Sequence, residues 1–238
     1  MKILIVSGFL GAGKTTFIKR LARNVDQRFA ILENEYGAAG IDGARLGQNR
    51  QGTQKNVWEM TEQCICCIGK KDFAASVLTI ANVVDPEYLI VEPTGVGSLA
   101  RIIENLRQIE YERIQLLSPV TIVDVYSYRH YMAEYPELYQ DQIRSADTII
   151  VSKTEACQAE EKQRIQKFLQ EINSQAKIIT DYASTMTRED YQSLLLGGRY
   201  EKEVQDTQSG EKMPETFSFE NIRMEAPETL WCFLCLLY

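Results

Sequence analysis

The sequence predicts an α/β fold, a mostly parallel sheet with helices on both faces, from two observations. Short apolar runs with strand character alternate along the chain with amphipathic segments at helical spacing, which is typical of parallel strands joined by crossover helices. The first apolar run, residues 2–6, leads into a glycine-rich loop that matches G-x-x-x-x-G-K-[ST]. The composition, 45% apolar and 25% charged, is that of an ordinary globular protein.

The glycine-rich loop predicts phosphate binding. Glycines allow backbone N–H groups to turn toward a phosphate, Lys14 is expected to reach the β- and γ-phosphates, and the Thr15 hydroxyl is expected to ligate Mg²⁺. A glycine-rich turn without a ligand is the alternative, but a strand before the loop and a helical pattern over 17–25 argue against it. We therefore place the fold in the P-loop NTPase class. The predicted nucleotide ligands of the loop are Gly8, Gly11, Ala12, Gly13, Lys14, Thr15 and Thr16.

The later elements continue the same alternation. Strands are expected at 29–32, 56–61, 88–91, 120–123, 147–151 and 177–179, and helices at 70–84, 98–107, 158–173 and 187–196. Residues 34–56 are rich in glycine and predict a long loop that is functional or mobile. We divide the chain into a nucleotide-binding domain at 1–197, a polar linker at 198–215, and a partial C-terminal domain or docking tail at 216–238.

The string Glu92-Pro93-Thr94-Gly95 follows an apolar strand. An acidic residue at that strand end would face the magnesium shell, and the Gly95 amide would meet the γ-phosphate, a contact that hydrolysis to the diphosphate removes. The string also fits a plain turn, but its place downstream of a phosphate loop favours function. The predicted catalytic set is Lys14, Thr15, Glu92 and Gly95.

Ser152-Lys153-Thr154-Glu155 ends a later strand, where GTP-binding proteins of this class keep N-K-x-D. A carboxylate accepts both the N1–H and the amino group of guanine, a pair of donors that adenine lacks. Here Glu155 is longer than Asp, so guanine is favoured only modestly, and a structural turn is the competing interpretation. The predicted contacts are Ser152, Lys153 and Glu155.

Cys64, Cys66 and Cys67 place three thiols within four residues. Thiolates are soft ligands for Zn²⁺, Cu⁺ or Co²⁺, so metal binding is favoured over redox chemistry and over core filling. A tetrahedral site needs one more ligand, Glu33 or water, and such an incomplete site suits metal transfer.

Charge and hydropathy bound the remaining possibilities. The net charge of -7 predicts no general attraction to nucleic acid or to anionic membranes. No apolar run reaches the roughly 20 residues of a membrane helix, and Met1-Lys2 leads into a short strand rather than a secretory signal. We expect a cytoplasmic protein.

The order of the motifs G-F-L-G-A-G-K-T-T, E-N-E-Y-G with G-I-D-G, C-I-C-C and E-P-T-G resembles the CobW family of GTPases, relatives of UreG and HypB, over about residues 1–195. Residues 217–231 resemble the opening of that family's C-terminal domain. The resemblance implies a metallochaperone in which GTP binding and slow hydrolysis drive delivery of Zn²⁺ or Co²⁺, with Ni²⁺ a further candidate, to a client protein; it leaves a homodimer open. It implies that Thr15, Glu92 and Asp42 serve magnesium, and that the cargo ion is held by Cys64, Cys66, Cys67 and Glu33.

Two other classes of function stay open. One is a nucleotide-dependent switch that acts on a partner protein and holds only a structural zinc. The other is an ATP-using kinase or ligase, which the order of motifs argues against. Under the metallochaperone hypothesis, the nucleotide state moves the loop 34–56 and thereby changes metal affinity.

Overall fold

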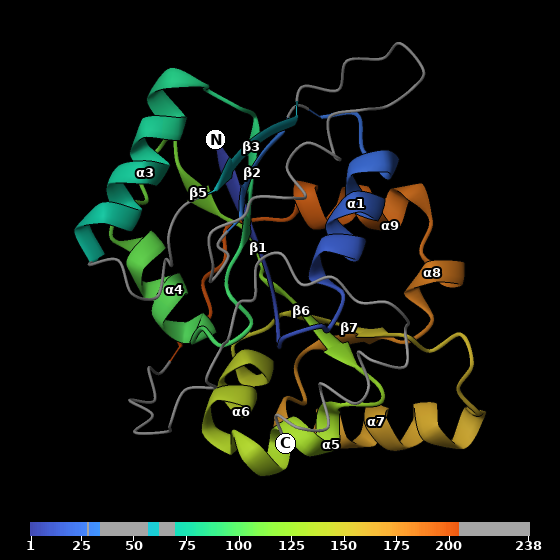
Figure 1. Ribbon diagram of the computed structural model, residues 1–238. Helices are drawn as coiled ribbons and strands as arrows, with labels where there is room; N and C mark the ends of the chain where they lie inside the picture. Colours follow the sequence, from blue (N-terminus) through green and yellow to red (C-terminus); the bar gives the residue numbers. More distant parts are fainter. Residues whose placement is uncertain (28, 34–56, 62–69, 205–238) are drawn as a thin grey trace, which may run out of the picture.

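The computed structural model describes residues 1–27, 29–33, 57–61 and 70–204 (Figure 1). The loop 34–56 with Asp42, the three clustered cysteines and the chain beyond residue 204 lie outside the described residues. What the sequence predicts for them stays a prediction.

A single sheet runs through the described part of the chain, and all pairings between its strands are parallel. The strands are β1 (Lys2–Gly8), β2 (Phe29–Glu33), β3 (Val57–Thr61), β4 (Tyr88–Glu92), β5 (Gln115–Leu116), β6 (Val120–Asp124), β7 (Thr148–Ser152) and β8 (Lys177–Ile179). Their order is β3-β2-β4-β1-β6-β7-β8, and the short β5 pairs with β1. The predicted fold class is therefore confirmed.

The central strand β1 is where the chain changes direction across the sheet. β2 to β4 lie on one side of β1, and β6 to β8 lie on the other. In such sheets ligands bind at this switch point, just outside the carboxyl ends of the strands. Gly8, Glu92 and Ser152 end β1, β4 and β7, so all three lie at that edge.

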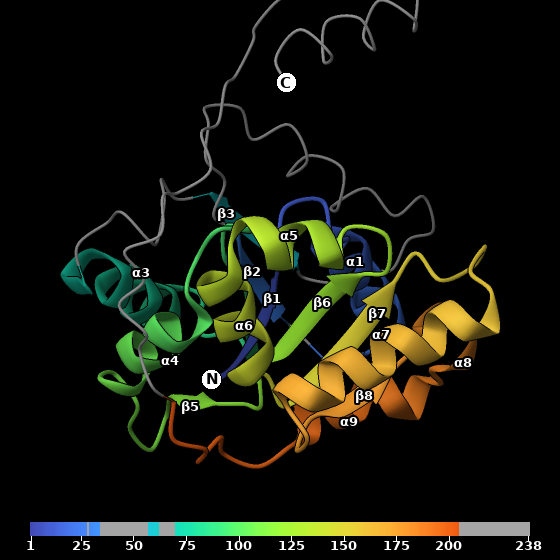
Figure 2. The ribbon, with the colours of Figure 1, turned by 90° about the horizontal axis from the view of Figure 1, so that it is seen from below.

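Helices cover both faces of the sheet, as predicted. They are α1 (Lys14–Asn24), α3 (Lys70–Val83), α4 (Leu99–Arg107), α5 (Tyr128–Glu134), α6 (Pro136–Arg144), α7 (Ala159–Ile172), α8 (Tyr182–Thr185) and α9 (Arg188–Leu196). Figure 1 shows α1, α8 and α9 on one side and α3 and α4 on the other, and Figure 2 shows α5, α6 and α7 over the β6–β7 half. No helix in the described ranges is both long enough and apolar enough to cross a membrane.

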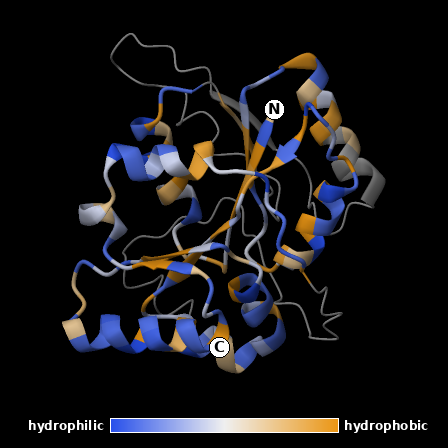
Figure 3. Ribbon diagram, turned by 180° about the vertical axis from the view of Figure 1, so that it is seen from behind, coloured by the Kyte–Doolittle hydropathy of each residue, from blue (hydrophilic) through white to orange (hydrophobic). Residues whose placement is uncertain are grey.

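The alternation of side chains along β1 explains why both faces are covered. Leu4 and Val6 pack with α1 and α9, whereas Ile3 and Ile5 pack with α3 and α4. Because successive strand side chains point to opposite faces, a run that is apolar throughout must be buried on both sides. Figure 3 shows this as hydrophobic strands at the centre between helices with hydrophilic outer surfaces.

Residues 125–146 differ from the sequence analysis, which predicted no element there. The structure has two consecutive helices, α5 and α6, and Pro136 lies at the first turn of the second one. Proline is tolerated at that position because the N–H it lacks would have no partner within the helix. The short β5 and α8 were also not predicted.

The first residues of the predicted polar linker contact the domain. Tyr200 is buried, its backbone N–H donates to the Leu116 carbonyl oxygen at 2.9 Å, and its hydroxyl donates to the Ser145 carbonyl oxygen at 2.9 Å. The Arg107 guanidinium lies over the Tyr200 ring at 5.5 Å. The chain is thus held to α4 and α6 after α9 ends.

Candidate functional site

The phosphate loop joins β1 to α1 through glycines that no other residue could replace easily. Gly8, Gly11 and Gly13 have φ angles of +145°, +66° and +100°, in the region that favours glycine. A Cβ at Gly8 would lie 2.5 Å from the Ile122 carbonyl oxygen on β6. The loop therefore presents backbone rather than side chains at the edge of the sheet.

Lys14, the first residue of α1, folds back over this loop. Its Nζ donates to the carbonyl oxygens of Gly8 at 2.9 Å and Phe9 at 3.3 Å. Burial lowers the pKa of Lys14, and the nearby Glu92 carboxylate acts in the opposite direction. A buried ammonium with this loss of hydration is stabilised by an anion, so the site favours a phosphate group.

Thr15 and Glu92 meet at the start of α1 and the end of β4. The Thr15 hydroxyl donates to a Glu92 carboxylate oxygen at 2.9 Å, although the two residues lie 77 positions apart in the sequence. Hydroxyl and carboxylate oxygens are the donors that Mg²⁺ prefers, so this pair fits a magnesium-bound nucleotide. Thr16, the next residue, is exposed.

Gly95 lies directly against the phosphate loop. A Cβ at this position would lie 2.5 Å from the Leu10 backbone nitrogen and 2.9 Å from its Cα. The neighbouring residues 93–97 are all buried. The E-P-T-G segment and the phosphate loop therefore form adjoining walls, and only glycine permits the close approach.

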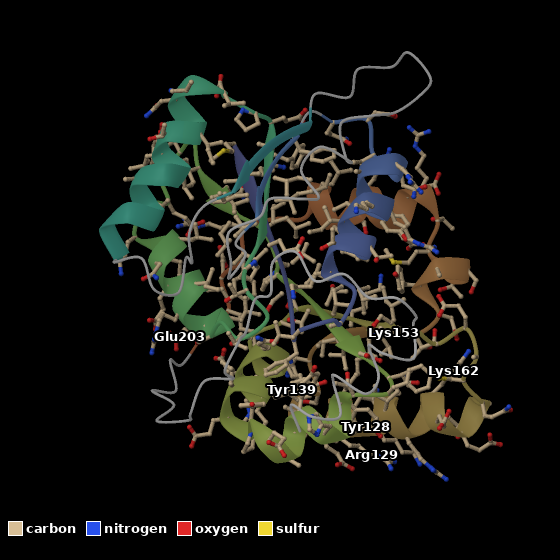
Figure 4. All side chains as sticks on the ribbon, in the orientation of Figure 1. Tyr128, Arg129, Tyr139, Lys153, Lys162 and Glu203 are labelled. Carbon is tan, nitrogen blue, oxygen red and sulfur yellow. The ribbon has the colours of Figure 1, made fainter. Side chains whose placement is uncertain are left out.

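The predicted base contacts at the end of β7 behave differently from one another. The Ser152 hydroxyl donates to the Ala12 carbonyl oxygen at 2.6 Å and so fixes the phosphate loop to β7. Lys153, labelled in Figure 4, has a φ of +59° and forms an ion pair with Asp124 at 2.6 Å. Glu155 is exposed. Only Ser152 of these three contacts the phosphate loop in a hydrogen bond of this structure.

A second carboxylate, Asp181, follows β8 at the same edge of the sheet. It accepts a hydrogen bond from Lys162 of α7 at 2.5 Å, and Figure 4 shows Lys162 on that helix. The hydrogen bond from Lys162 lowers the pKa of Asp181, burial opposes this, and the Thr154 side chain adds to the lowering. Asp181 and Asp124 were not predicted as site residues, although both follow short apolar strands, as Glu92 does.

The supporting residues on α5 and α6 were also missed. Phe9 of the phosphate loop is buried against Tyr131, Tyr135 and Tyr139, with ring centroids at 4.2, 5.5 and 5.6 Å. The Tyr131 hydroxyl also donates to the Leu10 carbonyl oxygen at 3.2 Å. Burial raises the pKa of Tyr139. These tyrosines recur at every fourth position, a helical spacing that could have revealed the packing.

The predicted cargo site is only partly within the described residues. Cys64, Cys66 and Cys67 lie outside them, and for Glu33 the structure gives the backbone, which pairs in register with Glu92. Among the residues that the structure describes, no group of three or more His, Cys, Asp or Glu side chains is arranged to hold a metal ion. Glu33 nevertheless ends β2 at the edge where the nucleotide residues lie.

The fold and this arrangement of loop, lysine, hydroxyl and carboxylate define a P-loop nucleotide-binding domain. Residues 2–180 match the model of the CobW/HypB/UreG nucleotide-binding domain, and the chain belongs to this family. The zinc chaperone YeiR of Escherichia coli is 30% identical over 178 residues, covering 74% of this chain and 53% of YeiR. The zinc chaperone CobW of Pseudomonas aeruginosa is 26% identical over 209 residues, covering 75% and 56%. The chain spans about half the length of the curated relatives it matches.

Solved structures agree on the fold. The Zn(II)-bound YjiA GTPase from E. coli has a TM-score of 0.57 at 20% identity, covering 85% of this chain and 66% of YjiA. The hydrogenase maturation factor HypB from Archaeoglobus fulgidus has a TM-score of 0.53 at 18% identity, covering 82% and 89%.

Proposed function

We propose that this chain is the nucleotide-binding part of a GTP-dependent metallochaperone that couples the binding and delivery of zinc to GTP binding and slow hydrolysis. The observation that carries the proposal is the contact of Thr15 with Glu92 beside a phosphate loop that Gly95 touches. Relatives named zinc chaperones support zinc as the cargo. Co²⁺ and Ni²⁺ are the other candidate ions.

For the nucleotide, the loop from Gly8 to Thr16 would hold the phosphates with its backbone N–H groups. Lys14 would leave the carbonyl oxygens of Gly8 and Phe9 and bind the β- and γ-phosphates instead. Thr15 and Glu92 would hold Mg²⁺, with Asp42 near it, and that ion neutralises negative charge on the phosphates when bound.

Gly95 is the residue through which the domain would distinguish GTP from GDP. Its backbone already lies against Leu10 of the loop, which supports a contact between the Gly95 N–H and a terminal phosphate bound by that loop. Turnover is expected to be slow, because the catalytic set of Lys14, Thr15, Glu92 and Gly95 holds no glutamine or arginine. Guanine selection is assigned to Ser152, Lys153 and Glu155.

For the cargo, Cys64, Cys66 and Cys67 would bind the ion, with Glu33 as the fourth ligand. The register of β2 and β4 supports this choice, because it puts Glu33 beside Glu92. A metal at Glu33 and a magnesium nucleotide at Glu92 would then occupy neighbouring strand ends, so that each could alter the binding of the other. We place the protein in the cytoplasm, where it would act on a metal-requiring client protein.

The test is a zinc titration of the full chain with a non-hydrolysable GTP analogue and, separately, with GDP. We expect the two zinc affinities to differ by about fivefold or more, and reciprocity requires zinc to change nucleotide affinity by the same factor. The double variant Cys66→Ser/Cys67→Ser should lose zinc affinity and keep nucleotide affinity. Cys157→Ser, at a half-buried cysteine on the nucleotide-binding domain, is the matched control and should keep both.

Equal zinc affinity in both nucleotide states would contradict the coupling. The cysteines would then hold a structural zinc, and the protein would be a nucleotide-dependent switch for a partner protein. A preference for ATP over GTP would instead favour the enzyme interpretation.

A further inference from the structure

One buried amide connects α6 to the segment that follows Glu92. Gln142 is 1% exposed, and its Nε2 donates to the carbonyl oxygens of Gly95 at 3.1 Å and Gly97 at 3.0 Å. Both N–H bonds of the amide are thus used on a segment 47 residues away in the sequence. The pairing fixes the backbone on either side of Val96.

The neighbours of Gln142 hold the same region in place. A carboxylate oxygen of Asp141 accepts from the backbone N–H groups of Leu99, at 2.6 Å, and Ala100, at 3.4 Å, in the first turn of α4. A carboxylate at a helix N-terminus is favoured both by these donors and by the helix dipole. The Thr121 hydroxyl donates to the backbone carbonyl oxygen of Gln142 at 2.9 Å and so connects α6 to β6.

The same helix also supports the other wall of the phosphate site. Tyr139, three residues before Gln142, packs its ring against Phe9 of the phosphate loop. α6 therefore contacts both the loop and the Gly95 segment, which approach each other at Leu10. One helix therefore contacts both walls, which begin at the ends of the directly paired strands β1 and β4.

We propose that Gln142 is a positioning residue that fixes the Gly95 backbone against the phosphate loop and so determines how strongly the domain distinguishes a nucleoside triphosphate from a diphosphate. Gly95 must be glycine to approach Leu10, but glycine is also the residue with the most backbone freedom. A donor held on the Gly95 carbonyl oxygen removes that freedom. This inference rests on the proposed function, in which the Gly95 amide contacts the γ-phosphate.

A second buried amide on the same part of the fold provides a matched control. Asn173 is 5% exposed, and its Nδ2 donates to the carbonyl oxygens of Ile143 at 2.8 Å and Ala146 at 2.9 Å. Asn173 thus forms hydrogen bonds to the carboxyl end of α6, whereas Gln142 forms hydrogen bonds to the Gly95 segment. Both side chains are buried and donate to backbone carbonyl oxygens, but Asn173 also accepts through Oδ1 from the backbone N–H groups of Gln175 and Ala176, each at 3.2 Å. Asn173→Leu is therefore a demanding control, because it removes at least as many hydrogen bonds as a change at Gln142 without touching the Gly95 segment.

The experiment compares Gln142→Met with Asn173→Leu in the full chain. Each variant replaces a buried amide by an apolar side chain of similar size and removes hydrogen bonds to buried carbonyl oxygens, so both should melt at a lower temperature than wild type. Only Gln142→Met should reduce the ratio of the affinity for a non-hydrolysable GTP analogue to the affinity for GDP, by about tenfold. Titration calorimetry with each nucleotide measures this ratio.

Gln142→Glu provides a second measurement and keeps the volume of the side chain. A protonated carboxyl can donate to one of the two carbonyl oxygens, whereas an ionised one is repelled by both. Burial raises the pKa of such a carboxyl group. In Gln142→Glu, the ratio of the affinity for the GTP analogue to the affinity for GDP should therefore be close to the wild-type ratio at low pH. It should fall below the wild-type ratio as pH rises and the carboxyl group ionises.

These measurements distinguish the failure of the Gln142 role from the failure of the proposed function. A wild-type ratio in Gln142→Met, or the same loss in Asn173→Leu, would overturn the positioning role while leaving the proposed function standing. A flat pH profile for Gln142→Glu would also overturn it. A wild-type chain that binds neither nucleotide would overturn the proposed function, and this inference with it.

Discussion

The phosphate side and the base side of the candidate site lie at one edge of the sheet but are built in opposite ways. On the phosphate side, Gly8 and Gly95 leave no room for a Cβ, and Lys14 is buried on loop carbonyl oxygens. On the base side, Lys153 is 47% exposed in its ion pair with Asp124, and Glu155 lies in solvent. Backbone geometry fixes the phosphate side, whereas two of the three predicted contacts on the base side, Lys153 and Glu155, are long exposed side chains.

The two sides should therefore respond differently to substitution. A change on the phosphate side meets packed backbone and should affect folding, binding of every nucleotide, or both. A change at Lys153 or Glu155 on the base side alters an exposed side chain and should affect mainly the choice of base, because substitutions at exposed positions usually change stability little. Three variants test this contrast, in order of decreasing expected effect.

Lys14→Met is expected to have the largest effect, a loss of nucleotide affinity on the order of 100-fold, because charge-assisted hydrogen bonds to the phosphates are removed. Lys153→Met removes a predicted base contact instead and should cost less than about tenfold, whereas Lys167→Met, at an exposed lysine of α7, is the matched control and should keep nucleotide affinity. Titration calorimetry with GTP and GDP measures all three. Retained nucleotide affinity in Lys14→Met would contradict the assignment of the phosphate loop.

The same variant has an expected pH signature in the nucleotide-free protein. Burial lowers the pKa of Lys14 in the folded state, so between that lowered pKa and the ordinary lysine pKa the unfolded chain binds more protons. The free energy of unfolding of the wild type should therefore rise with pH across that window, and below it the charged lysine destabilises the fold. Lys14→Met should remove this rise and melt no lower than wild type near neutral pH, in thermal unfolding.

Gly95→Ala should destabilise the domain by about 1–3 kcal/mol, since its Cβ would overlap the Leu10 backbone. Gly198→Ala is the control, because nothing lies within 4 Å of a Cβ there. Urea unfolding with a common m-value compares the two free energies of unfolding. Equal stability of the two variants would mean that the approach of Gly95 to the loop is not as close as described.

Glu155→Gln should have the smallest effect on the fold, within about 0.5 kcal/mol of the wild-type free energy of unfolding. It should lower GTP affinity relative to ATP by about tenfold, because an amide cannot accept both donors of guanine. Glu160→Gln, at another exposed glutamate nearby, should change neither. An unchanged preference in Glu155→Gln would leave Asp181 as the carboxylate to test next.

The contrast also explains what the sequence could predict. The phosphate loop, the strand ends at Glu92 and Ser152, and the parallel sheet follow from local patterns, because glycine spacing and apolar runs act over a few residues. The contact of Gln142 with Gly95 joins segments 47 residues apart, so local patterns do not specify it. Helices α5 and α6 were missed although the tyrosines keep a helical spacing, because Pro136 was not recognised as a residue in the first turn of a second helix.

The packing of Phe9 limits how the phosphate loop could be transplanted into another protein. The glycines expose the backbone that would bind a ligand, whereas the Phe9 ring packs against Tyr131, Tyr135 and Tyr139 in another part of the fold. If the loop alone were moved into another protein, the Phe9 ring would have no apolar pocket to pack in. The backbone conformation of the loop would then be less well fixed. A functional transplant should therefore include the loop together with the three tyrosines that pack on Phe9.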